Sequence, residues 1–143
     1  MFVQRARTCV LYLVSIAMSM IVVGGLGTQT AFARITANTI DPVAVVADNG
    51  RDVIVTGPLS CTAGERAYLR VTVTQRSTGA VAEGRTLLTC TESTQPWEVH
   101  ASTQGTEIFE EGPATVTAVA RTTERGETTD AHQWLVDLAL VRE

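Results

Sequence analysis

Two of the three cysteines, Cys61 and Cys90, enclose the stretch CTAGERAYLRVTVTQRSTGAVAEGRTLLTC. A pair of thiols at this spacing suits three kinds of chemistry: a structural disulfide, part of a metal site, or a reactive thiol. Zinc takes four ligands at short spacing, and neither cysteine has a C-x-x-C partner or a nearby histidine. A catalytic thiol requires an activating base and a compartment that keeps it reduced. The choice therefore depends on where the chain works.

The N-terminus has the three parts of a secretory signal peptide. A cationic start is followed by an apolar run over residues 9–23 and by the small-residue pattern Ala-Phe-Ala, which ends at Ala33. We predict cleavage between Ala33 and Arg34, so that residues 1–33 are a signal peptide and residues 34–143 form a single domain. An uncleaved membrane anchor is the alternative, because the apolar run is close to the roughly 20 residues that span a bilayer.

Export determines the chemistry of the cysteines. In an oxidising compartment, two cysteines that remain after removal of the leader usually pair. We therefore predict a disulfide between Cys61 and Cys90, which stabilises the fold by roughly 3 to 4 kcal/mol. The expected location is extracellular or in the cell envelope, and no cofactor is predicted.

The acidic balance of the chain limits its partners. The formal net charge is -4. Phosphate backbones and anionic membrane surfaces bind clustered cations, so we expect no nucleic-acid partner and no membrane contact except through an uncleaved signal segment. The expected partner is an extracellular protein or a small ligand.

Short runs rich in valine and threonine predict β-strands throughout residues 34–143. Asn49-Gly50 predicts a hairpin, because both residues tolerate the positive φ of a type I′ turn; a second hairpin is expected at residues 77–79. The last run, residues 132–141, is apolar on both faces and is expected to be central and covered on both sides. Residues 122–130 are expected to form an exposed hairpin loop. About seven such strands predict an all-β fold, an antiparallel immunoglobulin-like β-sandwich.

The size, leader and Ala/Thr/Val/Gly-rich strands resemble small secreted bacterial immunoglobulin-like β-sandwich proteins and, distantly, the neocarzinostatin-like apoproteins. This resemblance implies a seven-stranded sandwich, with an apolar ligand in the second group. The chain departs from both patterns. It has cysteines for one disulfide where the apoproteins have two, and Trp97 lies after both cysteines instead of between them. No site residue is carried over from either family.

Candidate catalytic and metal-binding groups are sparse. Glu127, Asp130 and His132 are close enough in sequence to suggest a transition-metal site, although a loop histidine is the more common case. The carboxylates at residues 107–111 are adjacent on one segment, whereas glycosidases use two carboxyls at a fixed separation across a cleft. Residues 48–52 lack the ligand spacing of a calcium loop. These patterns favour a protein that is not an enzyme.

Trp97 is the one candidate contact residue, because a tryptophan that is exposed beside an apolar patch is a frequent anchor of interfaces. A position in the core is the equally weighted alternative. We predict a secreted, non-enzymatic domain that acts as an extracellular binding or envelope-associated protein. One alternative is a carrier of small apolar ligands with a pocket between the sheets. A second is a small secreted hydrolase or metal enzyme.

Overall fold

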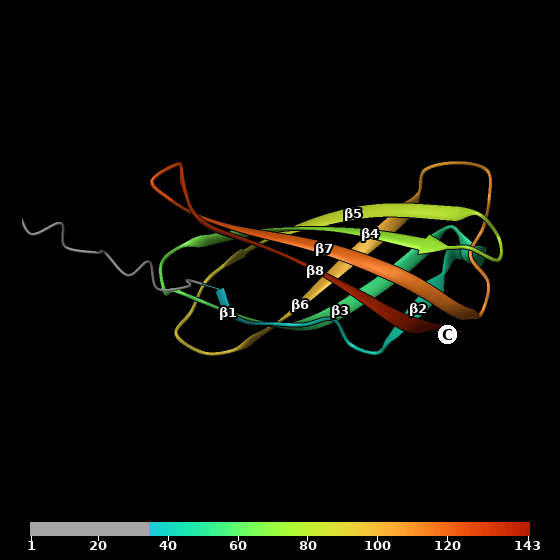
Figure 1. Cartoon of the computed structure of the whole chain (residues 1–143), viewed down its shortest axis with the longest axis horizontal. Helices are drawn as coiled ribbons and strands as arrows, with labels where there is room; N and C mark the ends of the chain where they lie inside the picture. The colour runs from blue at the N-terminus through green and yellow to red at the C-terminus, as the bar shows by residue number, and fades with distance from the viewer. Residues whose placement is uncertain (1–34) are drawn as a thin grey trace, which may run out of the picture. The chain divides into compact units, whose positions relative to one another are not determined.

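The computed structural model describes residues 35–143, all of which belong to one compact unit. The predicted signal peptide and its cleavage site between Ala33 and Arg34 lie outside these residues. The described chain consists of strands and one short 3-10 turn (Figure 1), which confirms the all-β prediction. Within this part of the chain, no helix has the length and apolarity needed to span a membrane. The elements are β1 (Ile35–Asn38), β2 (Val43–Ala47), η1 (Asp48–Gly50), β3 (Asp52–Cys61), β4 (Arg66–Gln75), β5 (Ala80–Thr89), β6 (Gln95–Thr103), β7 (Gly112–Glu124) and β8 (Glu127–Arg142).

Three hairpins supply much of the strand pairing. The predicted Asn49-Gly50 hairpin joins β2 to β3, and both turn residues have positive φ. The predicted turn at residues 77–79 joins β4 to β5, which pair along their whole length. β7 and β8 turn at Arg125-Gly126, again with positive φ at both residues. These two strands therefore extend through most of residues 122–130, and the predicted hairpin there has a shorter loop than expected.

The sheet closes on itself, which overturns the predicted open immunoglobulin-like sandwich. Going round the ring, the strand order is β3-β2-β8-β7-β4-β5-β6, and β6 then pairs with β3. The result is a seven-stranded barrel, with β1 as an eighth strand that continues β2 along the same edge of β3. Most neighbours are antiparallel, but β2 and β8 are parallel, pairing Val43 with Ala139 and Val46 with Arg142.

Two short pairings close the barrel, and local patterns do not reveal either of them. The parallel pairing of β2 and β8 joins strands that are far apart in the sequence, residues 43–46 and residues 139–142. β5 pairs with β6 at two positions, Ala82 with Thr103 and Glu83 with Ser102. The next residue of β5 is Gly84, where an added Cβ would lie 2.2 Å from the carbonyl oxygen of His100. The glycine thus permits the close strand approach that completes the ring.

Alternating side chains fill the barrel interior, as period-two strands require. Trp97 and Phe109, at 2% and 0% exposed, are the largest of the fully buried side chains. β8 is central in the sheet as expected, because its C-terminal end lies between β7 and β2. Its outward face, however, is open to solvent. Leu135 on that face is 63% exposed, so the prediction that this strand is covered on both sides is wrong.

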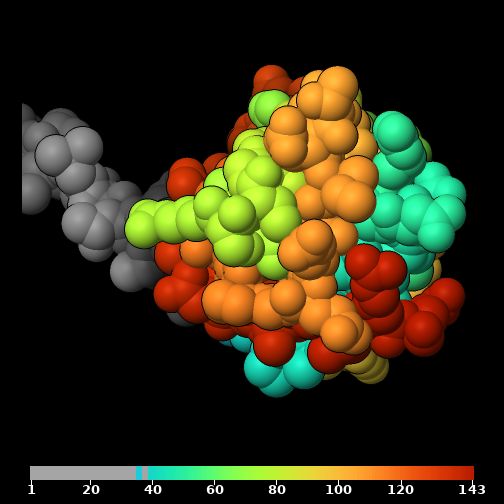
Figure 2. Space-filling view, turned by 90° about the vertical axis from the view of Figure 1, so that its right-hand side faces the viewer, coloured from blue at the N-terminus to red at the C-terminus, as the bar shows by residue number. Residues whose placement is uncertain are grey.

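The loop of residues 104–111 closes one end of the barrel. In Figure 2 this loop, in orange, lies between the β4–β5 turn and the segment around η1. The buried side chain of Gln75 holds it there: Nε2 donates to the carbonyl oxygen of Glu110 at 2.9 Å, and Oε1 accepts from the Glu110 N–H at 2.9 Å. The Phe109 N–H donates to the carbonyl oxygen of Gly50 at 2.8 Å. The loop therefore bridges η1 and β4 at this end.

Candidate functional site

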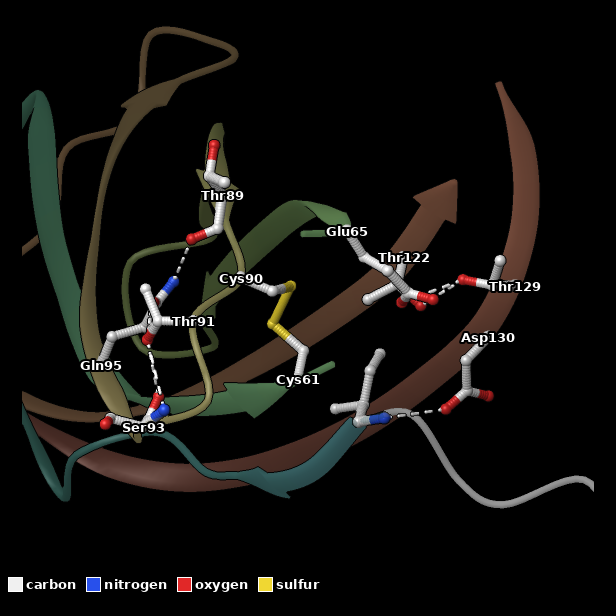
Figure 3. The surroundings of a disulfide bond; sticks show 11 residues. Cys61, Glu65, Thr89, Cys90, Thr91, Ser93, Gln95, Thr122, Thr129 and Asp130 are labelled. Atoms are coloured by element: carbon white, nitrogen blue, oxygen red, sulfur yellow. Dashed lines mark hydrogen bonds between the residues drawn. A yellow bond between two sulfur atoms is a disulfide. The ribbon is translucent and has the colours of Figure 1, made fainter. Parts of the chain in front are cut away.

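The predicted disulfide is present. Cys61 and Cys90 are joined with a Cα–Cα distance of 5.4 Å, and they are 6% and 3% exposed (Figure 3). The Cys90 N–H donates to the carbonyl oxygen of Glu65 at 2.8 Å, and the Gly64 N–H donates to the carbonyl oxygen of Cys90 at 3.0 Å. The bond thus fastens the end of β3 to the end of the β4–β5 hairpin. Because it is buried and backbone-anchored, its role is structural.

Trp97 lies in the core. Its indole Nε1 donates to the carbonyl oxygen of Pro58 at 3.3 Å, and its ring packs where an added Cβ on Gly57 would clash at 2.7 Å. The structure therefore supports the core position for Trp97 and not an exposed contact role. Its surroundings do include an outer hollow of about 720 Å³, which Asp41 and Glu98 give an acidic character.

Two of the three suggested metal ligands on β8, Asp130 and His132, make other contacts. Asp130 Oδ2 accepts a hydrogen bond from the Ile35 N–H at 3.0 Å, and the His132 ring lies 5.6 Å from that of Trp134. Across residues 35–143, no three histidine, cysteine or acidic side chains gather in a way that could hold a metal ion. Glu127 lies in the turn region of the β7–β8 hairpin.

His100 forms the clearest electrostatic cluster on β3 and β6. Its Nδ1 lies 3.0 Å from Asp52 Oδ2, and its Nε2 lies 3.1 Å from Glu98 Oε1. Both ring nitrogens can donate to these carboxylates only when the imidazole is protonated. The hydrogen bonds to Asp52 and then to Glu98 accordingly raise the pKa of His100. The cluster therefore places two carboxylates around one imidazole on the outer surface of β3 and β6.

The outer surface of β4 and its neighbouring strands is rich in arginine. We define the arginine face as the outward side chains of β4 from Arg66 to Thr74, together with the residues that pair across from them on β5, β7 and β8. Its charged members are Arg66, Arg70, Arg85, Arg121, Glu83 and Asp137. Four of the eight arginines of residues 35–143 are thus on one face, with two of the fifteen carboxylates. The remaining described residues hold four arginines and thirteen carboxylates.

Strand register places cations and apolar groups next to each other on this face. Tyr68 lies between Leu87 on β5 and Arg121 on β7. In the next outward row, Arg70 lies between Arg85 and Val119. The large apolar side chains exposed on the face are Tyr68 at 41%, Val81 at 40%, Leu87 at 42%, Val119 at 38% and Leu135 at 63%.

Arg70 and Arg85 form a like-charge cross-strand pair, which is unfavourable for folding. Glu83 relieves it: its Oε2 lies 2.6 Å from Arg70 Nη2, and its Oε1 lies 3.6 Å from Arg85 Nη2. The hydrogen bond from Arg70 is the main cause of the lowered pKa of Glu83. Departures from such local rules are expected at functional sites, so the pair favours a binding role for this face.

A hollow of about 700 Å³ lies at the centre of the arginine face. Tyr68, Leu87 and Val119 give it apolar walls, and arginines border it. The guanidinium of Arg121 lies 6.0 Å from the centre of the Tyr68 ring, within the range of a cation–π contact. The hollow therefore combines an apolar surface with positive charge.

Sequence reasoning missed this site, although a signal was present. The predicted turn at residues 77–79 brings Tyr68 and Arg70 near Leu87 and Arg85, but the exact pairing of Arg70 with Arg85 and of Tyr68 with Leu87 comes from the register of the structure. The addition of β7, which brings Arg121 and Val119, required the tertiary structure. Comparison of the chain with known protein families gives no match, and comparison with curated proteins gives none at a significant level.

Proposed function

We propose that this protein is an exported, non-enzymatic binding domain that contacts an extracellular partner through the arginine face. The observation that carries the proposal is the segregation of charge: an acidic domain places half of its described arginines around exposed apolar side chains on one face. The disulfide and the signal-like N-terminus are compatible with a location outside the cell.

The composition of the face fits a contact surface. Tyrosine and arginine are the residue types most enriched among interface residues that contribute strongly to binding, together with tryptophan. Interfaces are also depleted in lysine and acidic residues at their centres. Tyr68 and Arg121 occupy the middle of the face, and its carboxylates, Glu83 and Asp137, are on the strands that flank β4 and β7.

Binding on the outer surface is preferred to a pocket between strands. The barrel interior is occupied by large side chains, among them Trp97, Phe109 and Leu69. The hollow that combines charge with apolar walls lies outside, over β4, β5 and β7. A ligand carried within the barrel would have to displace this core, at a cost of several kcal/mol per large side chain.

Site-specific photocrosslinking in cells that export the protein tests the proposal. Benzoylphenylalanine placed at Leu87, on the arginine face, should give a discrete crosslinked adduct on irradiation. The same group at Glu107, an exposed residue of the 104–111 loop, is the matched control and should give none. The adduct should disappear in the R121E variant. Equal crosslinking from both positions, or none from Leu87, would contradict a binding role for this face.

A further inference from the structure

The cations of the arginine face differ in how far their charge is already neutralised. Arg70 and Arg85 share the carboxylate of Glu83. Arg121, by contrast, forms no ion pair with a carboxylate within 4.0 Å among residues 35–143, and its guanidinium lies 6.0 Å from the centre of the Tyr68 ring. A guanidinium offers forked N–H donors that match a carboxylate, and contact with an aromatic ring limits its motion. Arg121 is thus a preorganised and unneutralised anion site.

An apolar surface lies directly beside this cation. Leu87, Tyr68 and Val119 are each about two-fifths exposed and border the same hollow of about 700 Å³. Strands in a sheet are about 4.8 Å apart, so an apolar side chain seated between Leu87 and Val119 would bring its own neighbouring residue within reach of Arg121. The site therefore requires an apolar group and an anion that are close together.

We infer that the hollow receives a protein segment that carries an aliphatic or aromatic side chain next to a carboxylate. This inference rests on the proposed function and specifies its partner. The partner's apolar side chain packs on Tyr68, Leu87 and Val119, and its carboxylate accepts hydrogen bonds from Arg121. The contact is charge-complementary, and it buries apolar area at the same time.

The charge of the whole domain favours a short acidic segment over an extended polyanion. Nucleic acids, sulfated glycans and anionic bilayers gain affinity by contacting many cations at once. Outside the arginine face, the described residues hold four arginines against thirteen carboxylates. A long polyanion that extends past the hollow would meet this negative charge and be repelled, whereas a compact segment would not.

The test uses a capped hexapeptide of alternating glutamate and leucine, titrated into isotope-labelled protein and followed by NMR. We expect chemical-shift changes centred on Tyr68, Leu87, Val119 and Arg121. The R121E variant should weaken binding at least about tenfold, while R76E, the same charge change at an exposed residue after β4, should change it less than about twofold. Replacing the peptide's glutamates with glutamine should also weaken binding at least about tenfold.

Other outcomes overturn the inference in distinguishable ways. If the Leu87 crosslink forms but the peptide leaves the NMR spectrum unchanged, the binding role stands and the acidic–apolar chemistry is wrong. Saturable binding of a heparin fragment or of phosphatidylglycerol vesicles in preference to the peptide would replace the protein segment with a polyanion or a membrane. Sedimentation showing a dimer that dissociates in R121E would assign the face to a second copy of this chain. If crosslink and peptide both fail, the proposed function fails too.

Discussion

Reduction of the Cys61–Cys90 disulfide should cause a large and calculable loss of stability. The bond closes a loop with a sequence separation of 29 residues. On the chain-entropy model, a loop of about 30 residues restricts the unfolded chain by about 12 cal/mol/K, or about 3.6 kcal/mol at 25 °C. Unfolding entropy is about 2.1 cal/mol/K per residue, so for a domain of about 110 residues the corresponding fall in Tm is about 15 °C.

The assay compares oxidised protein with protein that is reduced and held in reducing agent, by urea denaturation and by thermal melting. The two samples have the same sequence, so the difference isolates the cross-link. Urea m should rise on reduction, because the unfolded chain becomes less compact. The C61A/C90A variant should lose slightly more stability than the reduced protein, since it also removes two buried sulfur atoms.

The structure also predicts which backbone amides lose protection when the disulfide is reduced. The Cys90 and Gly64 amides donate hydrogen bonds across the junction of β3 with the β4–β5 hairpin. Their hydrogen exchange should accelerate on reduction by more than that of the Phe109 amide at the other end of the barrel. A loss of stability below about 1 kcal/mol, well under the calculated value, would refute the reasoning, because it would mean that the cross-link does little to restrict the unfolded chain.

Further predictions concern barrel closure, the core and pH. G84A should destabilise the fold by about 1 to 3 kcal/mol in urea titrations, because the new Cβ would lie 2.2 Å from the carbonyl oxygen of His100. The control is G105A, where an added Cβ meets nothing within 4 Å, and it should change stability by less than about 0.5 kcal/mol. Equal effects of the two substitutions would contradict the steric role of Gly84. F109A should cost about 3 to 5 kcal/mol by the same assay, and a smaller loss would show that the barrel end collapses around the cavity. Because the folded pKa of His100 is raised, its contacts with Asp52 and Glu98 should stabilise the fold fully below about pH 6.5, and this stabilisation should be lost as the pH rises through the folded pKa. H100Q should abolish this pH dependence of stability between pH 5.5 and 8, whereas the control H132Q should retain it. An unchanged stability profile in H100Q would refute the assignment.

The sequence predicts the hairpins of this protein much better than it predicts the closure of the sheet into a barrel. The positive-φ turn at Asn49-Gly50 and the alternation over residues 66–75 define hairpins through neighbouring residues, and both are present. The barrel depends on contacts whose partners lie far apart, such as Val43 with Ala139. A glycine in a strand, such as Gly84, indicates a close backbone approach, but only the fold shows which backbone approaches. The apolar residues on both faces of residues 132–141 are typical of a strand that is covered on both sides, but only the fold shows that the outward face of β8 is open to solvent, with Leu135 63% exposed.

In the candidate site, too, some features can be predicted from the sequence and others require the tertiary structure. Parity and compartment suffice to predict the disulfide, since both are properties of the chain as a whole. The arginine face depends on the register of four strands, β4, β5, β7 and β8. Its arginines are scattered along the sequence, and only the fold makes Tyr68 and Arg121 neighbours. Trp97 has the sequence context of either a core or a contact residue, and packing against Gly57 decides in favour of the core.

The parallel pairing of β2 with β8 affects the order in which this protein assembles. Because Val45 pairs with Val141, the ring cannot close until the end of β8 has reached β2. The β2–β3, β4–β5 and β7–β8 hairpins join neighbouring strands and can form before that step. Contacts between distant segments form slowly, so we expect closure of the ring to come late in folding, after the β4–β5 hairpin that Cys90 follows.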